Sequence, residues 1–222
     1  MPTYFTPAFV AFFKELSRNN NTTWFNENKK TYEQDVKTPF TKLIQDVINE
    51  ASKLDPSIQI EAKDAITRIN RDIRFSKDKS PYKLHMSAII SAKGKKVKES
   101  PGIYIEISPE HIMVYGGAYM LEKESLLNVR SAISKNMKAF DKLITDKTFV
   151  KLFGSIQGEK NKVLAPAFKS LLDEQPLLAN KNFYYVAEIP FEQLTSNTLL
   201  KTIMTYYKAG KPLNDFLIEA IG

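Results

Sequence analysis

The chain has 222 residues, of which 43% are hydrophobic and 26% are charged, and its mean hydropathy of −0.31 is typical of a soluble globular protein. It contains no cysteine and only two histidines, which excludes disulfides, thiolate metal sites, iron–sulfur ligation and a histidine-rich metal site, so the sequence indicates no metal. A formal net charge of +7 favours an anionic partner.

The sequence shows no targeting or membrane segment. Its first seven residues lack the basic start and apolar stretch of a secretory signal. The longest uncharged run of note, residues 111–121, is shorter than the roughly 18 apolar residues that a membrane-spanning helix needs. We therefore expect a cytoplasmic protein without a membrane partner.

The N-terminal part of the chain predicts helices. A threonine followed by a proline marks a helix start at Thr6 and another at Thr38. Apolar residues at three- and four-residue spacing extend these two helices to Arg18 and Leu54. A further helix is expected from residue 22 or 23.

This intermediate helix carries three side chains at four-residue spacing, and they are therefore expected on one face: Trp24, Asn28 and Tyr32. They either wall a pocket beside the arginine-rich segment described below or form the seam between helix and sheet. The seam is favoured because large aromatic residues dominate protein cores.

The pattern then changes to the two-residue period of strands. Alternation predicts strands over residues 83–91, 103–108, 111–115 and 183–189, and the short connections between the first three indicate an antiparallel meander. Leu84 is expected on the buried face of the first strand. His85 and His111 fall on predicted strands and are expected to be half-exposed. The polar link over residues 93–101 is typical of a protruding hairpin tip.

Helical spacing returns after Gly116 and Gly117, which are expected to form the turn that leaves the third strand. Helices are predicted between residues 126 and 153, where they cover the sheet, and over residues 199–207 and 213–221. Residues 155–182 carry no clear pattern.

Arg130 falls on the predicted buried stripe of the first of these helices. It is interpreted either as a paired structural arginine, which is favoured, or as a further anion ligand. No linker, repeat or low-complexity tract divides the chain. The fold class is therefore α+β, with an antiparallel meander sheet packed by N-terminal, middle and C-terminal helices in a single domain over residues 1–222.

The positive charge is concentrated in one part of the chain. Residues 68–98 contain ten basic and two acidic side chains, and the rest of the chain is close to neutral. Three of the five arginines lie within residues 68–74. Because a guanidinium group offers a rigid fork of donors suited to phosphate and carboxylate, this clustering indicates an anion site.

If residues 66–74 are extended, Arg71 shares a face with Ile69, Ile73 and Phe75 and needs a carboxylate or a bound anion beside it. In the functional interpretation the arginines and a lysine hold the anion, an aspartate orients a basic group or carries a proton, and a tyrosine supplies a hydroxyl or a ring. The residues are Arg68, Arg71, Asp72, Arg74, Asp78, Lys79 and Tyr82.

Two alternatives stay open. In one, the basic residues 68–98, with Lys93, Lys95, Lys96 and Lys98, bind the phosphate backbone of a nucleic acid. In the other, the aspartates clamp the arginines internally, fix how the helical part docks on the sheet, and leave an interaction module without a ligand site. The sequence leaves open any reaction, cofactor and oligomeric state.

Residues 71–83, with the sequence RDIRFSKDKSPYK, resemble the signature of a family found mainly in bacteria and known as domain of unknown function 2461. The resemblance extends to Phe13, Trp24-Phe25 and Gly116-Gly117, and covers essentially the whole chain. The family also leads us to expect an acidic-His-Pro step near residue 176, where this chain has Glu174-Gln175-Pro176. The resemblance implies a compact domain of mixed helix and sheet and assigns no activity, cofactor or catalytic residue.

Overall fold

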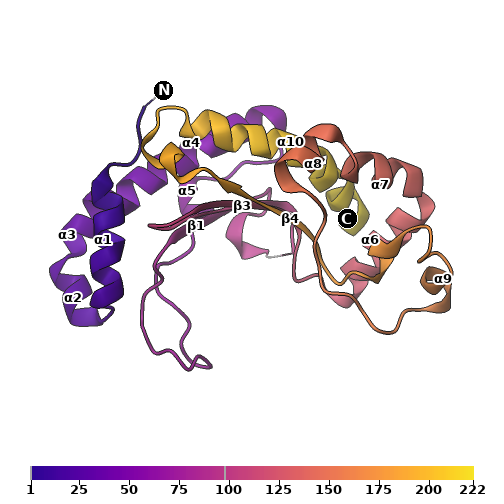
Figure 1. Cartoon of the computed structure of the whole chain (residues 1–222), viewed down its shortest axis with the longest axis horizontal. Helices are drawn as coiled ribbons and strands as arrows, with labels where there is room; N and C mark the ends of the chain where they lie inside the picture. The colour runs from indigo at the N-terminus through magenta and orange to yellow at the C-terminus, as the bar shows by residue number, and fades with distance from the viewer. Residues whose placement is uncertain (1, 98) are drawn as a thin grey trace. The chain divides into compact units, whose positions relative to one another are not determined.

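The computed structural model describes residues 2–97 and 99–222. Its sheet has four antiparallel strands in the order β1-β2-β3-β4, with helices in the N-terminal, middle and C-terminal parts of the chain (Figure 1). The predicted α+β class and meander are therefore confirmed.

The chain divides into two compact units. The first unit comprises residues up to 96 together with 104–114 and 188–205, and the second comprises 97–103, 115–187 and 206–222. The prediction of a single domain stays a prediction.

The N-terminal segment of the first unit is helical. Its elements are α1 (Pro7–Arg18), α2 (Thr22–Glu27), α3 (Lys29–Thr31), the π-helical turn η1 (Tyr32–Lys37), α4 (Thr38–Leu54) and α5 (Ala62–Ala65). The Thr6 hydroxyl accepts a hydrogen bond from the Ala8 amide at 3.3 Å, and this cap fixes the start of α1 as predicted. α1 contacts η1 and α4 contacts β1, so phenylalanines and aliphatic residues of these helices form the core of the first unit.

The predicted helix over Trp24, Asn28 and Tyr32 is broken. Asn28 ends α2 with a non-helical backbone, and its side-chain amide donates to the Trp24 carbonyl at 2.9 Å. Tyr32 begins η1 and is buried, whereas Trp24 and Asn28 are half-buried. The backbone amide of Asn28 still donates to the Trp24 carbonyl at 3.0 Å and the Tyr32 amide to the Asn28 carbonyl at 3.0 Å. Trp24 and Tyr32 both pack against Phe12, so these two side chains still share a face across the break.

The strands are β1 (Met86–Ile90), β2 (Gly102–Ile107), β3 (Ile112–Ala118) and β4 (Phe183–Ile189). The isoleucines at alternate positions of β2 are buried, as their two-residue period predicts. β1 begins later than expected, and Leu84 is exposed. His85 and His111 each lie just before a strand instead of within one.

The second unit contains α6 (Lys123–Lys135), α7 (Met137–Ile144), α8 (Lys147–Phe153) and α9 (Pro166–Lys169). The short turns η2 (Gly94–Lys96), η3 (Pro176–Ala179) and η4 (Phe191–Thr195) and the helix α10 (Leu199–Ile221) complete the described elements. Val129, Ile133, Phe140, Phe149 and Leu217 belong to the core of the second unit.

Two predicted breaks are absent from the structure. Gly116 and Gly117 lie within β3 instead of in a turn. Glycine is required at both positions, because a Cβ at position 116 would overlap the Tyr185 ring and Gly117 has a φ of +93°. α10 runs through Pro212 as one helix, and Gly210 there faces Tyr185. Packing of this segment therefore overrides the local helix-breaking signal. Within residues 2–97 and 99–222 no helix is long and apolar enough to cross a membrane.

Candidate functional site

The arginine loop, residues 68–83, connects α5 to β1 as an irregular hairpin (Figure 1). Its two arms are joined by backbone bonds from the Arg71 amide to the Pro81 carbonyl at 2.8 Å and from the Lys83 amide to the Ile69 carbonyl at 2.9 Å. The arms are thus ordered by ladder-like pairing, and the tip over residues 72–79 projects beyond them.

The base of the loop is attached to the N-terminal helices. The Asn20 side-chain amide donates to the Tyr82 carbonyl at 2.9 Å, and the Tyr82 amide donates to Asn20 Oδ1 at 3.1 Å. The Tyr82 ring is buried and stacks on Phe25 with centroids 4.0 Å apart. Tyr82 therefore serves as an anchor, and its backbone and ring both hold the loop in place.

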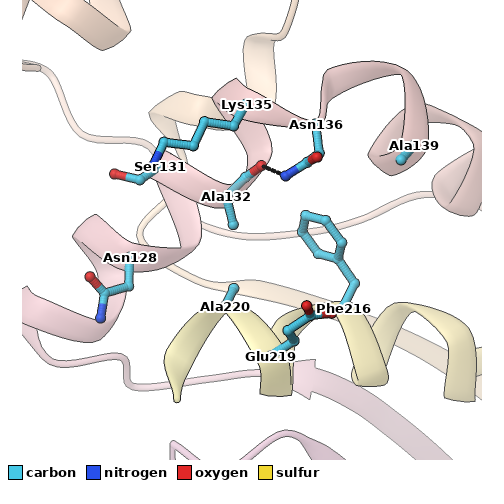
Figure 2. Close-up of a pocket in the computed structure, with 9 residues that line it drawn as sticks. All are labelled: Asn128, Ser131, Ala132, Lys135, Asn136, Ala139, Phe216, Glu219 and Ala220. Carbon is cyan, nitrogen blue, oxygen red and sulfur yellow. Dashed lines mark hydrogen bonds between the residues drawn. The ribbon is translucent and has the colours of Figure 1, made fainter.

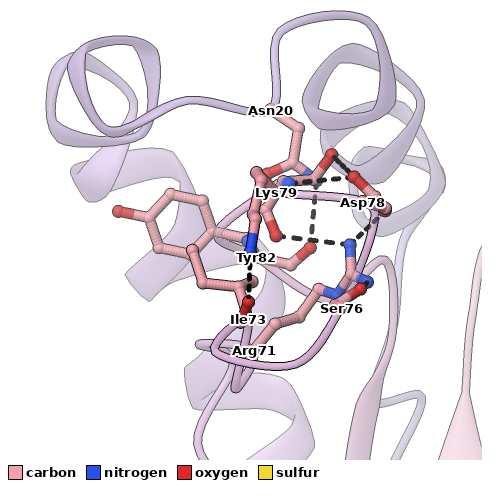
Figure 3. A network of polar contacts seen from close by, with 8 residues as sticks. Asn20, Arg71, Ile73, Ser76, Asp78, Lys79 and Tyr82 are labelled. Carbon is pink, nitrogen blue, oxygen red and sulfur yellow. Dashed lines mark hydrogen bonds and ion pairs between the residues drawn. The ribbon is translucent and has the colours of Figure 1, made fainter.

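Arg71 is satisfied within the loop. It forms an ion pair with Asp78, and its guanidinium also donates to the Ser80 carbonyl and the Ser76 hydroxyl, each at 3.3 Å (Figure 3). The pKa of Asp78 lies well below its usual range, because the Ser80 hydroxyl and amide donate to the carboxylate and Arg71 adds a further donor. This clamp closes the tip on itself and does not join the helices to the sheet.

The other predicted residues of the tip also have hydrogen-bond partners within the loop. Arg74 donates to Asp72 through Nε at 2.9 Å and Nη2 at 2.7 Å, and these bonds lower the pKa of Asp72. Lys79 Nζ donates to the Ile73 carbonyl at 3.0 Å (Figure 3). Phe75 is 95% exposed, so the prediction that it shares an apolar face with Arg71 was wrong.

Arg68 differs from the other arginines of the loop. It is exposed, and within the described part of the chain it has no hydrogen bond or ion pair. Lys83 is half-buried and donates to the Thr67 hydroxyl at 3.1 Å. Burial lowers the pKa of Lys83, the negative charge of Glu106 opposes this, and the positive charge of Arg68 lowers it further. Arg68 and Lys83 therefore form a pair of cations that an anion would stabilise.

The structure brings the two histidines together on one carboxylate, which the sequence did not predict. His85 Nε2 lies 3.5 Å from Glu106 Oε2, and His111 Nε2 lies 3.2 Å from Glu106 Oε1. The Tyr104 hydroxyl donates to Glu106 Oε2 at 2.7 Å. We call His85, Glu106 and His111 the histidine cluster. The alternation in β2 could have indicated Glu106, because it places Tyr104 and Glu106 opposite the buried isoleucines.

Arg130 belongs to the second unit and is only 5% exposed. Its Nη2 donates to the carbonyl oxygens of Asn180 at 3.0 Å and Ala179 at 3.4 Å, at the end of η3. Its Nε and the Oδ1 of Asn180 have no hydrogen-bond partner among the described residues. Arg130 thus binds backbone carbonyls at a helix end, where a cation is favourable, instead of the carboxylate of a structural pair.

The lysine-rich link over residues 93–101 is held by hydrogen bonds of Lys95 and does not protrude freely as a hairpin tip would. Lys95 Nζ donates to the carbonyl oxygens of Lys63 at 2.5 Å and Ile66 at 2.8 Å, next to α5. Lys98 lies outside the described residues. No group of three or more histidines, aspartates and glutamates in the described part of the chain could hold a metal ion.

A pocket of about 560 Å³ opens in the second unit between α6, α7 and the end of α10 (Figure 2). Small side chains, Phe216, Lys135 and Glu219 contribute to its walls, and Asn136 there donates to the Ala132 carbonyl at 3.0 Å. None of the residues predicted from the sequence lines this pocket.

Comparison with protein families gives one match that spans nearly the whole chain. The model of the family described as conserved hypothetical protein (DUF2461) matches residues 8–216, which confirms the resemblance carried by residues 71–83. A comparison with curated proteins finds no significant match.

Proposed function

We propose that this chain, which belongs to the conserved hypothetical protein family DUF2461, binds a small anionic ligand at the arginine loop. The ligand bears a phosphate or a carboxylate, as the chemistry of the loop residues favours. The observation that carries this proposal is the exposed, unpaired guanidinium of Arg68 beside Lys83. The positive charges of Arg68 and Lys83 repel each other, and an anion between them relieves that repulsion.

The other predicted residues take supporting roles in this proposal. The Arg71–Asp78 clamp and the anchor at Tyr82 fix the shape of the loop, so that Arg68 and Lys83 are held in place before the ligand arrives. Arg74 and Lys79 have partners within the tip, at Asp72 and the Ile73 carbonyl, and contribute positive charge to the loop as a whole. Preorganisation of this kind lowers the entropic cost of binding.

The test is calorimetric titration of the folded protein with inorganic phosphate and with acetate at low salt. Arg68→Ala should weaken binding by about tenfold or more, the equivalent of one lost charge-assisted hydrogen bond. Arg18→Ala is the matched control, because Arg18 is also exposed but pairs with Glu15 in α1, outside the loop. Absence of saturable binding by the wild type, or equal affinity in Arg68→Ala, would refute the proposal.

A second candidate is single-stranded nucleic acid, and Phe75 is the observation in its favour. Its ring is 95% exposed, with the Arg74 guanidinium 5.8 Å from the ring centroid and the exposed Lys77 nearby in sequence. An exposed ring flanked by cations can stack on a base, with a contribution of about 1–3 kcal/mol per base. Fluorescence anisotropy with DNA and RNA oligonucleotides tests this: affinity should fall steeply with salt and drop in Phe75→Ala.

A further inference from the structure

The histidine cluster contains both histidines of this protein. The chain contains two histidines, which lie 26 positions apart at the starts of β1 and β3, and both direct Nε2 at the one carboxylate of Glu106 on β2. The side chain of Glu106 is 18% exposed, and those of His85 and His111 are 27% and 36% exposed, so the cluster is shielded yet reachable from solvent.

Charged groups around the cluster link it to the proposed anion site. The negative charge of Glu106 and the positive charges of Lys83 and His111 act on His85, and Lys83 in turn experiences the charges of Glu106 and Arg68. Tyr104 contributes a hydroxyl to Glu106. Lys83, two residues before His85, thus supplies a fixed cation near an imidazole whose charge depends on pH, and Arg68 acts on Lys83 in turn.

We propose that His85 and His111, held by Glu106, are the proton-exchanging arm of this anion site, and that the ligand is a phosphate monoester. The inference rests on the proposed function, because Arg68 and Lys83 supply the fixed charge that draws the anion in. Both Nε2 atoms face Glu106, so the Nδ1 of each protonated imidazole is the donor left for the phosphate oxygens, and two protonated imidazoles carry one positive charge more than Glu106 neutralises.

Proton chemistry distinguishes a phosphate monoester from a carboxylate. The second ionisation of a phosphate monoester has a pKa near 6, close to the value of about 6.5 for an unperturbed imidazole, whereas a carboxylic acid ionises near 4. Near neutral pH, a phosphate monoester and an imidazole are therefore both partly protonated, whereas a carboxylic acid is fully ionised. A phosphodiester has no second ionisation and therefore lacks this match.

The surroundings of His85 determine how its pKa responds to a bound anion. Burial lowers the pKa of His85 below its ordinary value, and the positive charges of Lys83 and His111 lower it further, while Glu106 opposes them. A bound phosphate adds negative charge beside His85 and raises its pKa. The imidazole of His85 therefore takes up a proton when the anion binds.

The experiment is a histidine-selective NMR titration of the whole protein, with and without inorganic phosphate. Two histidines give two sets of imidazole signals, so each midpoint is read directly. Phosphate should raise the midpoint of at least one imidazole by about one pH unit, the equivalent of a tenfold change in affinity. Dimethyl phosphate, a diester, should raise neither midpoint by as much.

Variants separate this inference from the proposed function. Glu106→Gln keeps the shape of the side chain and removes its charge, and should lower the midpoint of His85, whose pKa Glu106 raises, and reduce the phosphate-induced shift. His85→Gln combined with His111→Gln should still bind phosphate through Arg68, but the proton uptake by the imidazoles should be lost. Calorimetry across buffers of different ionisation enthalpy should therefore show fewer protons taken up than in the wild type.

The outcomes are distinct. If phosphate binds through Arg68 and neither midpoint moves, the proton-exchanging arm is refuted and the proposed function stands. If dimethyl phosphate shifts the midpoints as much as phosphate does, the assignment to a monoester is wrong. If phosphate does not bind the wild type at all, both proposals fail together.

Discussion

Asn20 and Tyr82 are joined by a reciprocal pair of hydrogen bonds, with 2.9 Å from Asn20 Nδ2 to the Tyr82 carbonyl and 3.1 Å from the Tyr82 amide to Asn20 Oδ1. One side chain thus satisfies both backbone groups of a residue 62 positions away. The loop that follows α1 therefore acts as a strand-like partner for the base of the arginine loop.

Asn20→Ala should lower the free energy of unfolding by about 1–3 kcal/mol, because it leaves a part-buried donor and acceptor of Tyr82 without partners. Urea denaturation monitored by circular dichroism measures the change. Asn26→Ala is the control, since Asn26 is exposed on α2, and should change stability by less than about 0.5 kcal/mol. Equal effects of the two substitutions would contradict the anchoring role.

Arg71→Ala should loosen the tip of the arginine loop with little effect on global stability. Its side chain is 28% exposed and bonds only to groups of the loop itself, namely Asp78, Ser76 and the Ser80 carbonyl. Hydrogen exchange over residues 72–80 should therefore accelerate, while exchange in α4 stays unchanged. Arg74→Ala is the comparison, because Arg74 pairs with Asp72 in an exposed local contact. If Arg71→Ala leaves exchange at residues 76–80 unaffected, the clamp does not order the tip.

The elements that the sequence predicted well are those fixed by local chemistry. Thr6 and Pro7 determine the start of α1, and the alternation of residues 183–189 sets the bounds of β4. Thr38 is the first residue of α4 but forms no cap there, because the chain enters α4 directly from η1. These signals act within a few residues, so spacing alone is sufficient to find them.

The histidine cluster required information that no local pattern contains. Glu106 meets His85 and His111 only because β1, β2 and β3 are neighbours in a particular register, and a shift of one residue would turn Glu106 to the other face. Similarly, the expectation that residues 66–74 are extended placed Phe75 on one face with Arg71. The backbone pairing ends at the bond from the Arg71 amide to the Pro81 carbonyl on the opposite arm, and Phe75 beyond it is exposed.

Stability should depend on pH through His85. Burial is the main cause that lowers its pKa in the folded state below the unfolded value of about 6.5. The unfolded chain therefore protonates this imidazole more readily than the folded protein does. The contribution of His85 to stability is fully present above about pH 6.5, and it is lost as the pH falls from there through the lower pKa of the folded state. Thermal denaturation should therefore show a loss of stability between about pH 7 and pH 5, and His85→Gln should flatten that part of the profile. A wild-type profile that is flat over this range would contradict the burial of the neutral imidazole.

Gly210 should be intolerant of even a methyl group. Alanine normally stabilises a helix interior relative to glycine by about 0.5–1 kcal/mol. Here a Cβ would overlap Oη and the adjacent ring carbons of Tyr185, which is 2% exposed and whose hydroxyl donates to Asn214 Oδ1 at 3.1 Å. The buried ring cannot move aside freely, so Gly210→Ala should destabilise the protein by about 1–3 kcal/mol.

A double-mutant cycle with Tyr185→Phe checks this cause. Removal of the hydroxyl takes away the closest of the clashing atoms, so Gly210→Ala should cost less in the Tyr185→Phe background than in the wild type. The interaction energy from urea denaturation of the four proteins should be at least about 0.5 kcal/mol. Additive effects would mean that backbone strain in α10, and not contact with Tyr185, sets the requirement for glycine.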